Sequence, residues 1–448
     1  MEKKEKKKRE INIQNIFCFI SFIFILVCIL WYGGRFIYFY LDNKKTLTKE
    51  STTLARIIKT ENNDKETFKQ INGDYYFYQD ATNNYVSYSN LIWRIIKINK
   101  DNTITLINDN IISTLAYGDN KDTYEESNLM NWLNTKKTNS NTGKLETILN
   151  EKEKYLKKNS TCIDNIDDIK NVTCKKESKN TYLNLLSITD YLYTGGTKSF
   201  INNEKNTYLS NKNKDNELWY INEDGKLDTT EGNDILGIKA TITLKKDIEL
   251  KSGTGSKEDP YKFEDTINLI GSYVKLDEDI WRVYEEKDGI IKLVLNDTLK
   301  DKEEEFKYKY SNNSYYHNDT IYGSLAYYLN HTYYNSLSYK NLIIENTYIN
   351  SYYNSDNNYN YQEMSSNTIE TKISIPSLDD IILNDTLTNY FTNTGLSDKS
   401  SLIYIRKNNG TITSKNVQTE NSIVPCISIE KENLKVGNGT IDDPYRTE

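Results

Sequence analysis

Residues 93–98 read Trp-Arg-Ile-Ile-Lys-Ile, and this segment decides how the rest of the chain is interpreted. Its opening pair, Trp93-Arg94, returns 188 residues later as Trp281-Arg282. A tyrosine stands eight residues before each tryptophan, at Tyr85 and Tyr273. A shared offset of this length indicates two copies of one domain and not a short-repeat solenoid.

A second repeated segment closes each copy. Residues 253–261 read Gly-Thr-Gly-Ser-Lys-Glu-Asp-Pro-Tyr and end in Pro260-Tyr261. Residues 437–445 read Gly-Asn-Gly-Thr-Ile-Asp-Asp-Pro-Tyr and end in Pro444-Tyr445. Glycines followed by a proline are typical of a tight loop. We therefore place a first repeat module at residues 72–263 and a second at residues 264–448.

The pattern within each module predicts an α+β fold. Residues 91–99 and 103–108 are expected to pair as a hairpin, because the Asn and Asp between them tolerate the positive φ of such turns. Alternation puts Trp93 and Ile96 on opposite faces of an apolar strand, which predicts a central strand covered on both sides. Trp93 is thus predicted to be a core residue. The alternative is a stacking platform for a sugar.

Two further elements of the first module follow from periodicity. Leu129, Trp132 and Leu133 have helical spacing behind Ser127, which predicts a short helix with a serine N-cap. Residues 238–244 alternate between apolar and polar positions and predict one strand.

The N-terminal region predicts a membrane anchor. Residues 1–10 form a basic tail that we place in the cytoplasm, and residues 11–41 form a transmembrane signal anchor with an aromatic interfacial flank. A cleaved signal peptide is the rival interpretation, but the apolar run is long and lacks a small-residue cleavage site. Residues 42–71 are then a helical stalk or a flexible linker. The expected location is the cell membrane, with both modules outside the cell.

Composition argues against a nucleic-acid partner. The chain of 448 residues has a net charge of −7. The basic tail has six Lys or Arg residues and three Glu residues, so it contributes +3 and leaves −10 for the rest. Contacts to phosphate need positive patches, which this balance disfavours.

The remaining chemistry-bearing residues predict a disulfide and no catalytic, cofactor or metal site. Cys162 and Cys174 lie in a polar segment, where an extracellular pair is more often a disulfide than a metal site. The two histidines, His317 and His331, have no nucleophile at a suggestive spacing. Cys426 lies in a predicted strand and is expected to be a buried thiol.

Several of these motifs together resemble a known family. They are Trp93-Arg94 and Trp281-Arg282, the helix at 129–134, Leu186-Ser187, the strand at 241–244 and the closing Gly-x-Gly-x-x-x-Asp-Pro-Tyr segments. The set resembles an uncharacterised extracellular domain family of low-GC Gram-positive bacteria and their wall-less relatives, over nearly all of residues 72–448. Met130-Asn131 stands where that family has Arg, and Lys239-Ala240 and Val424-Pro425 also lack its Arg. The resemblance implies a fold distantly like the C-type lectins and formylglycine-generating enzymes, and such an analogy says little about activity.

The sequence therefore favours a single-pass surface protein that binds a glycan or protein ligand without catalysis. The alternatives are an enzyme of the formylglycine-generating or hydrolytic type and a structural component of the cell envelope. An enzyme would need a nucleophile or metal set in at least one module, and the two copies share no cysteine or histidine.

Overall fold

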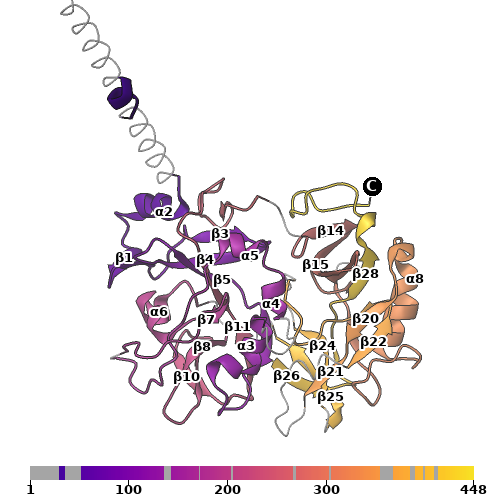
Figure 1. Cartoon of the computed structure of the whole chain (residues 1–448). Helices are drawn as coiled ribbons and strands as arrows, with labels where there is room; N and C mark the ends of the chain where they lie inside the picture. Colours follow the sequence, from indigo (N-terminus) through magenta and orange to yellow (C-terminus); the bar gives the residue numbers. More distant parts are fainter. Residues whose placement is uncertain are drawn as a thin grey trace, which may run out of the picture.

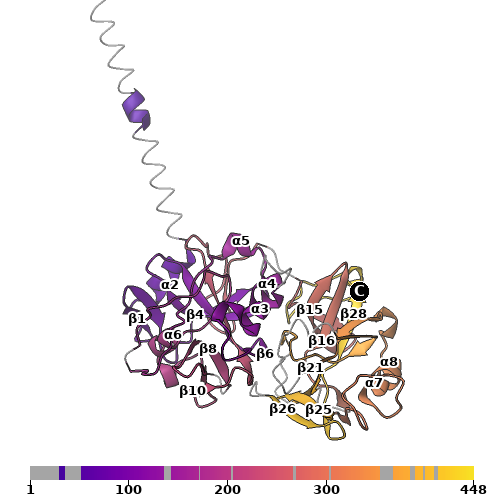
Figure 2. The same ribbon diagram turned by 60° about the horizontal axis from the view of Figure 1, so that its bottom comes forward.

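The computed structural model describes residues 30–35 and 52–447, apart from 136–142, 171, 203–204, 266–268, 302–303, 354–366, 384–388, 397–398 and 408–411. Within these residues the chain is rich in strands, which form several mainly antiparallel sheets, and its helices are few and short. Figure 1 shows two lobes side by side, one from indigo to magenta and the other from orange to yellow. The turned view in Figure 2 shows the same two lobes.

The predicted basic tail at 1–10 lies outside the described residues, and so does the predicted anchor at 11–41 except for residues 30–35. Residues 30–35 are helical, and Leu30, Trp31 and Tyr32 are exposed. Among the described residues, no helix has both the length and the apolar character that crossing a membrane requires.

The first repeat is built on an eight-stranded sheet. Its strands are β1 (Phe68–Ile71), β2 (Asp74–Phe77), β3 (Tyr85–Tyr88), β4 (Leu91–Ile98), β5 (Ile104–Asn108), β7 (Asn184–Leu185), β12 (Ala240–Leu244) and β13 (Tyr261–Lys262). They run in the order β1-β2-β4-β5-β12-β7, and β3 pairs with both β4 and β13. The predicted hairpin is β4 and β5, with Asn102 at a φ of 64° in the turn. As predicted, β4 lies inside the sheet with Trp93 and Ile96 fully buried.

A five-stranded sheet lies next to it. Its strands are β6 (Ser113–Ala116), β8 (Thr207–Lys212), β9 (Leu218–Ile221), β10 (Leu227–Thr230) and β11 (Ile235–Ile238), in the order β10-β9-β8-β11-β6. The helices of this repeat are α2 (Leu54–Asn62), η1 (Tyr124–Glu126), α3 (Asn128–Leu133), α4 (Lys144–Thr147), α5 (Lys152–Tyr155), α6 (Ile188–Tyr193) and η2 (Gly196–Lys198). Helix α3 is the predicted one, and the Ser127 hydroxyl caps it by accepting from the Met130 N–H at 3.2 Å.

The second repeat has the same two sheets in the same strand order. The order β14-β15-β16-β28-β23 matches β3-β4-β5-β12-β7, and the order β26-β25-β24-β27-β19 matches β10-β9-β8-β11-β6. The strands are β14 (Tyr273–Leu276), β15 (Asp279–Lys287), β16 (Ile290–Leu295), β19 (Lys307–Lys309), β23 (Ile373–Ser374), β24 (Tyr390–Leu396), β25 (Lys399–Arg406), β26 (Ile412–Asn416), β27 (Glu420–Ser422) and β28 (Cys426–Glu430). The repetition seen in the sequence is thus also a repetition of topology.

The other elements of the second repeat lie outside this common pattern. They are β17 (Lys300–Asp301), β18 (Glu304–Glu305), β20 (Asn346–Ile349), β21 (Ser351–Tyr353), β22 (Thr368–Thr371), η4 (Lys340–Leu342), η5 (Lys431–Asn433) and a helical run of α7 (Leu325–Tyr327), η3 (Tyr328–Tyr333) and α8 (Tyr334–Ser336). The Ser324 hydroxyl caps α7 as Ser127 caps α3.

One boundary differs from the sequence-based prediction. Residues 42–71 were expected to be a stalk or linker, but the described part of that range is folded against the first repeat. Helix α2 buries Leu54 and Ile58 completely, and β1 pairs with β2 along its whole length. The helix in this range is therefore docked through its buried apolar residues and is not part of a free stalk, and the first repeat begins before residue 72.

The expected single strand at 238–244 is two strands in different sheets. The chain leaves the five-stranded sheet at the end of β11 and enters the eight-stranded sheet at Ala240. Lys239 occupies the step between them. Its side chain is buried, and its ammonium group donates to the Ile201 carbonyl at 2.9 Å. Alternation continued across the step, so the pattern alone did not reveal the change of sheet.

Because Lys239 is buried, we expect the free energy of unfolding of the protein to rise at alkaline pH. Burial lowers the pKa of its ammonium group to about 7. The unfolded chain therefore binds more protons between about pH 7 and pH 10.5, so the free energy of unfolding contributed by this group rises across that range. Denaturant titrations at several pH values should show the rise, and Lys239→Met should remove it. An identical pH profile in the variant would contradict this prediction.

Candidate functional site

The two closing loops have the same backbone structure. In residues 253–261 the N–H of Gly255 donates to the Asp259 carbonyl at 3.0 Å, and in residues 437–445 the N–H of Gly439 donates to the Asp443 carbonyl at 3.0 Å. The φ values of these two glycines are 77° and 79°, which favour glycine. A Cβ on Gly255 would also lie 2.3 Å from the Tyr261 ring. The repeated glycines are therefore required by local geometry.

Each loop brings its tyrosine to the strand that precedes the Trp-Arg strand of its own repeat. Tyr261 pairs with Val86 of β3, and Tyr445 forms a parallel bridge with Val274 of β14. Pro260 and Pro444 are both buried. Tyr261 is fully buried and donates its hydroxyl to the Glu61 carboxylate of α2 at 2.7 Å. Each loop is thus fixed beside the strand that pairs with its Trp-Arg strand, β3 in the first repeat and β14 in the second.

The arginines of the two Trp-Arg pairs make equivalent contacts. The Arg94 guanidinium lies over the Tyr85 ring at 4.0 Å and donates to its hydroxyl at 3.0 Å. The Arg282 guanidinium lies over the Tyr273 ring at 4.1 Å and donates to its hydroxyl at 2.9 Å. The tyrosine and arginine face each other across the strand pair in both repeats. This pairing explains why both residues recur at the same offset.

The tryptophans of the signature are core residues by their burial. Trp93, Trp132 and Trp281 all have no exposed surface. The Trp93 indole donates to the Tyr88 carbonyl at 3.0 Å, and the Trp132 indole donates to the Asp379 carbonyl of the other repeat at 2.9 Å. A fully buried ring offers no face to a ligand, so these three positions do not form a sugar platform in this structure.

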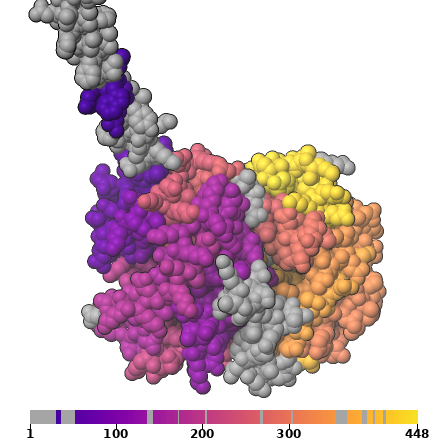
Figure 3. All heavy atoms as spheres, in the orientation of Figure 1, coloured from indigo at the N-terminus to yellow at the C-terminus, as the bar shows by residue number. Residues whose placement is uncertain are grey.

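A cleft of about 570 Å³ lies where the two repeats meet. Both closing loops line it, through Lys257 and Pro260 on one side and residues 439–442 on the other, and Lys262 lines it directly after the first loop. Figure 3 shows the two loops at the same edge of the molecule, with the yellow segment of the second repeat near the pink segment of the first. The Trp-Arg strand of the second repeat contributes Arg282, and the first repeat contributes residues 108 and 110–112.

The cleft is basic although the protein is acidic. Among the described residues that line it, six side chains are cationic and two are acidic, which gives a net charge of +4 for this lining in a chain whose net charge is −7. The cationic residues are Lys205, Lys257, Lys262, Arg282, Arg406 and Lys407, and the acidic ones are Glu258 and Asp442. Charge of one sign in a concave site with protein walls raises the local concentration of ligands of the opposite sign.

Arg406 joins the cleft to the interface between the repeats. Its guanidinium is buried and donates to the Tyr390 hydroxyl at 3.0 Å, to the Leu378 carbonyl at 2.9 Å and to the Thr114 hydroxyl at 3.1 Å. Tyr390 and Leu378 belong to the second repeat, and Thr114 belongs to the first. Arg406 therefore holds the two walls of the cleft together.

A buried ion pair reinforces the same interface. The Lys144 ammonium of the first repeat lies 2.7 Å from a carboxylate oxygen of Asp380 and 3.9 Å from one of Asp379 in the second repeat. Burial alone would lower the pKa of Lys144, but the two carboxylates outweigh it and raise the pKa. The same ammonium holds the pKa of Asp380 below its ordinary value against the opposing effect of burial. Nothing in the sequence pattern indicated this contact of Asp379 and Asp380 with Lys144.

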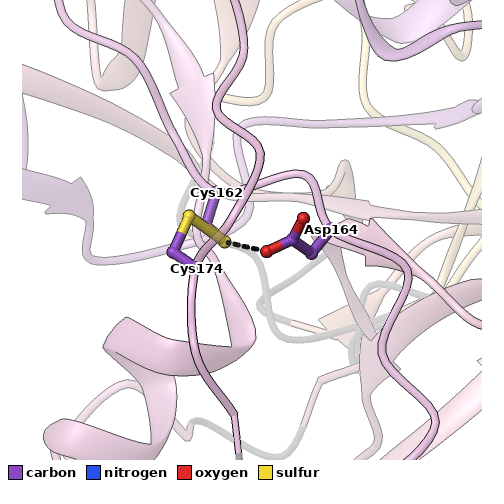
Figure 4. A group of neighbouring side chains, drawn as sticks. All are labelled: Cys162, Asp164 and Cys174. Carbon is purple, nitrogen blue, oxygen red and sulfur yellow. Dashed lines mark hydrogen bonds between the residues drawn. A yellow bond between two sulfur atoms is a disulfide. The ribbon is translucent and has the colours of Figure 1, made fainter.

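The predicted disulfide is present and lies away from the cleft. Cys162 and Cys174 are bonded, with their Cα atoms 5.7 Å apart. The Asp164 carboxylate lies 3.8 Å from Cys162 Sγ, as Figure 4 shows. Among the described residues these three side chains are the one group with a spacing that could suit a metal, but both sulfurs are used in the disulfide. The described residues that line the cleft include no cysteine and no histidine.

The free cysteine and the two histidines that the sequence analysis singled out lie outside the cleft. Cys426 is a buried free thiol whose pKa is raised by burial. The Nε2 atom of His317 is buried, and burial lowers the pKa of this ring to about 4. His331 is exposed, stacks on Tyr327 and contacts the Asp319 carbonyl at 3.1 Å through its ring. None of the three lines the cleft.

The chain matches no protein-family model, no curated protein and no solved structure. Its function is therefore argued from the geometry and chemistry of the cleft.

Proposed function

We propose that the chain is a membrane-anchored surface protein whose two modules bind an extracellular glycan or protein ligand in the cleft between them, without catalysis. The observation that supports this most is that the repeated Gly-x-Gly loops of both modules line a single cavity. A repeat that served only to build a scaffold would not need both of its closing loops at one concave site. The two copies thus work as one binding unit.

The size and lining of the cleft suit a small ligand or a short segment of a polymer. Its volume of about 570 Å³ is within the range of roughly 300–1,000 Å³ that is usual for ligand pockets. Its lining includes the exposed apolar residues Ile92 and Ile441 and the exposed Asn110, whose amide can form hydrogen bonds. The proposed resemblance to an extracellular domain family with a distant C-type-lectin-like fold is compatible with this function, but a likeness of folds carries no activity by itself.

A binding array tests the proposed function. The full-length chain in detergent would be applied to glycans and to surface proteins, together with Asn110→Trp, which adds bulk at an exposed position of the cleft. We expect binding that Asn110→Trp reduces by at least tenfold because the ring occupies ligand volume. Asn63→Trp, on an exposed residue just after α2, is the matched control and should bind normally. Binding to nothing would favour a structural role in the cell envelope.

A hydrolytic or formylglycine-generating-like enzyme is the alternative. The cleft contains two carboxylates, Glu258 and Asp442, at equivalent places in the two closing loops. A pair of carboxylates can act as acid and base on a glycosidic bond. The double variant Glu258→Gln/Asp442→Asn separates the two functions. Turnover of a bound glycan that this variant abolishes would favour the enzyme, whereas unchanged glycan after long incubation supports binding alone.

The anchor predicts a definite topology. The basic residues 1–10 and the apolar run that begins at residue 11 favour a cytoplasmic N-terminus. Protease added to intact cells should therefore remove a tag fused to the C-terminus, as followed by immunoblotting. A tag that stays protected until the cells are lysed would contradict the proposed surface location.

A further inference from the structure

The lysines of the cleft differ from those that stabilise the fold. The ammonium groups of Lys205, Lys257, Lys262 and Lys407 make no hydrogen bond or ion pair within the described part of the chain. Several half-buried lysines elsewhere have polar or acidic partners within the protein. Lys97, for example, lies 2.8 Å from the Asp190 carboxylate. The cleft therefore brings together four positive charges that have no ion-pair partner within the described residues.

Of these four lysines, Lys205 gives the strongest indication that the cleft binds an anion. It lies just before β8 and is only partly exposed, and burial lowers the pKa of its ammonium group. The nearby Asp109 opposes that shift, but its carboxylate is 3.5 Å from Arg94, which is its ion-pair partner. An anion in the cleft would restore the interactions that the Lys205 ammonium loses on burial.

The aromatic groups of the cleft argue against a nucleic acid as the anion. Single-stranded nucleic acids are held by stacking their bases on exposed aromatic rings. The Tyr273 ring is covered on one face by the Arg282 guanidinium, and Tyr390 is almost fully buried. The exposed residues of the cleft include Asn110 with its amide, Thr440 with its hydroxyl, Ile92 and Ile441. Amide and hydroxyl groups beside small apolar surfaces match the hydroxyl groups and C–H faces of a sugar.

We infer that the cleft binds a short segment of an acidic saccharide, whose carboxylate or phosphate groups lie between the lysines of the first repeat and Lys407 of the second. This inference rests on the proposed function and specifies its ligand class. The closing loop of the first repeat supplies Lys257, the following β13 supplies Lys262, and Arg406 and Lys407 lie at and just after the end of β25. An anion that bridges these groups contacts both repeats.

The test is a calorimetric titration of the full-length chain in detergent. The probes are trigalacturonate, a phosphorylated maltotriose, neutral maltotriose and a short oligothymidylate. At low salt we expect at least one acidic saccharide to bind at least ten times more tightly than neutral maltotriose, and this preference should shrink at about 0.3 M salt because of screening. The two acidic probes then distinguish a carboxylate ligand from a phosphate ligand.

Charge variants test whether the lysines of the cleft cause the preference for acidic saccharides. Lys257→Gln/Lys262→Gln/Lys407→Gln removes three cleft charges and should weaken binding of the acidic saccharide by about tenfold or more. The control, Lys170→Gln/Lys176→Gln/Lys214→Gln, removes three charges from exposed residues outside the cleft and should have little effect. All six residues are exposed or partly exposed, so both variants should keep the melting temperature of the parent.

The outcomes separate this inference from the proposed function. Equal binding of neutral and acidic saccharides, both weakened by Asn110→Trp, would overturn the inference and leave the cleft as the binding site. Oligothymidylate as the tightest probe would also overturn it. Binding of acidic saccharides that neither the cleft triple variant nor Asn110→Trp weakens would overturn both.

Discussion

Replacing Lys144 by alanine should destabilise the protein by about 3–5 kcal/mol, because the change leaves Asp379 and Asp380 buried at the interface without their cation. The Asp379 side chain is almost fully buried, so water cannot replace the ammonium without opening the contact between the repeats. Chemical denaturation followed by tryptophan fluorescence measures the loss.

Two controls make the Lys144 result specific. Lys226→Ala removes a lysine whose ion pair with Asp224 is exposed on both sides, and it should change stability little. The triple variant Lys144→Met/Asp379→Asn/Asp380→Asn removes all three charges and should recover part of the loss. A cost for Lys144→Ala as small as that of Lys226→Ala would show that the ion pair does not hold the repeats together.

Trp281→Ala should also cost about 3–5 kcal/mol, since it empties the space of a fully buried ring in the core of the second repeat. The sequence alone predicts two thermal transitions, of which this variant loses one. The structure changes that expectation, because the buried core is continuous across both repeats and Trp132, Lys144 and Arg406 bridge them. We expect one cooperative transition in the parent chain, shifted to lower temperature in the variant.

Trp93→Ala is the matched variant in the first repeat. Trp93 occupies the equivalent position of β4 and is equally buried, so it should lower the same transition by a similar amount. Scanning calorimetry of both variants distinguishes one cooperative unfolding unit from two independently unfolding domains. Two separate transitions, each lost in only one variant, would show that the repeats are independent domains.

The sequence predicted those parts of the fold that depend on local periodicity and turn chemistry. The hairpin of β4 and β5 followed from its Asn and Asp turn, and helix α3 followed from its spacing and its serine cap. The burial of Trp93 followed from apolar positions on both faces of one strand. These features are decided within about ten residues, where a single sequence carries enough information.

The sequence did not predict features that depend on long-range packing. Alternation across Lys239 concealed the change of sheet, and helical spacing in residues 54–62 could not tell a stalk from a docked helix. The contact of Lys144 with Asp379 and Asp380 joins residues more than 230 positions apart, with no motif on the lysine side. Such contacts follow from how the repeats pack, which an intramodule pattern does not encode.

The sequence singled out some of the residues that line the cleft, but it did not predict that they come together in one binding site. The Gly-x-Gly loops and Arg282 stood out as repeated, and the sequence assigned them a structural role. Lys205, Arg406 and Lys407 carried no repeated signal, and the net charge of −7 hid their concentration in one cleft. An average charge cannot show a local excess of the opposite sign. That both repeated loops line the same cleft as these cationic residues becomes apparent only when both repeats are placed together.

Hydrogen–deuterium exchange with and without trigalacturonate tests most directly whether the two repeats form one binding site. The account predicts that the ligand slows exchange in both closing loops, residues 253–261 and 437–445, and in residues 108–112 between them in the cleft. The same experiment on Lys257→Gln/Lys262→Gln/Lys407→Gln should show weaker protection at all three segments. Protection confined to one repeat, or found on α2 or the disulfide loop at 162–174 while the closing loops stay unchanged, would contradict a shared cleft.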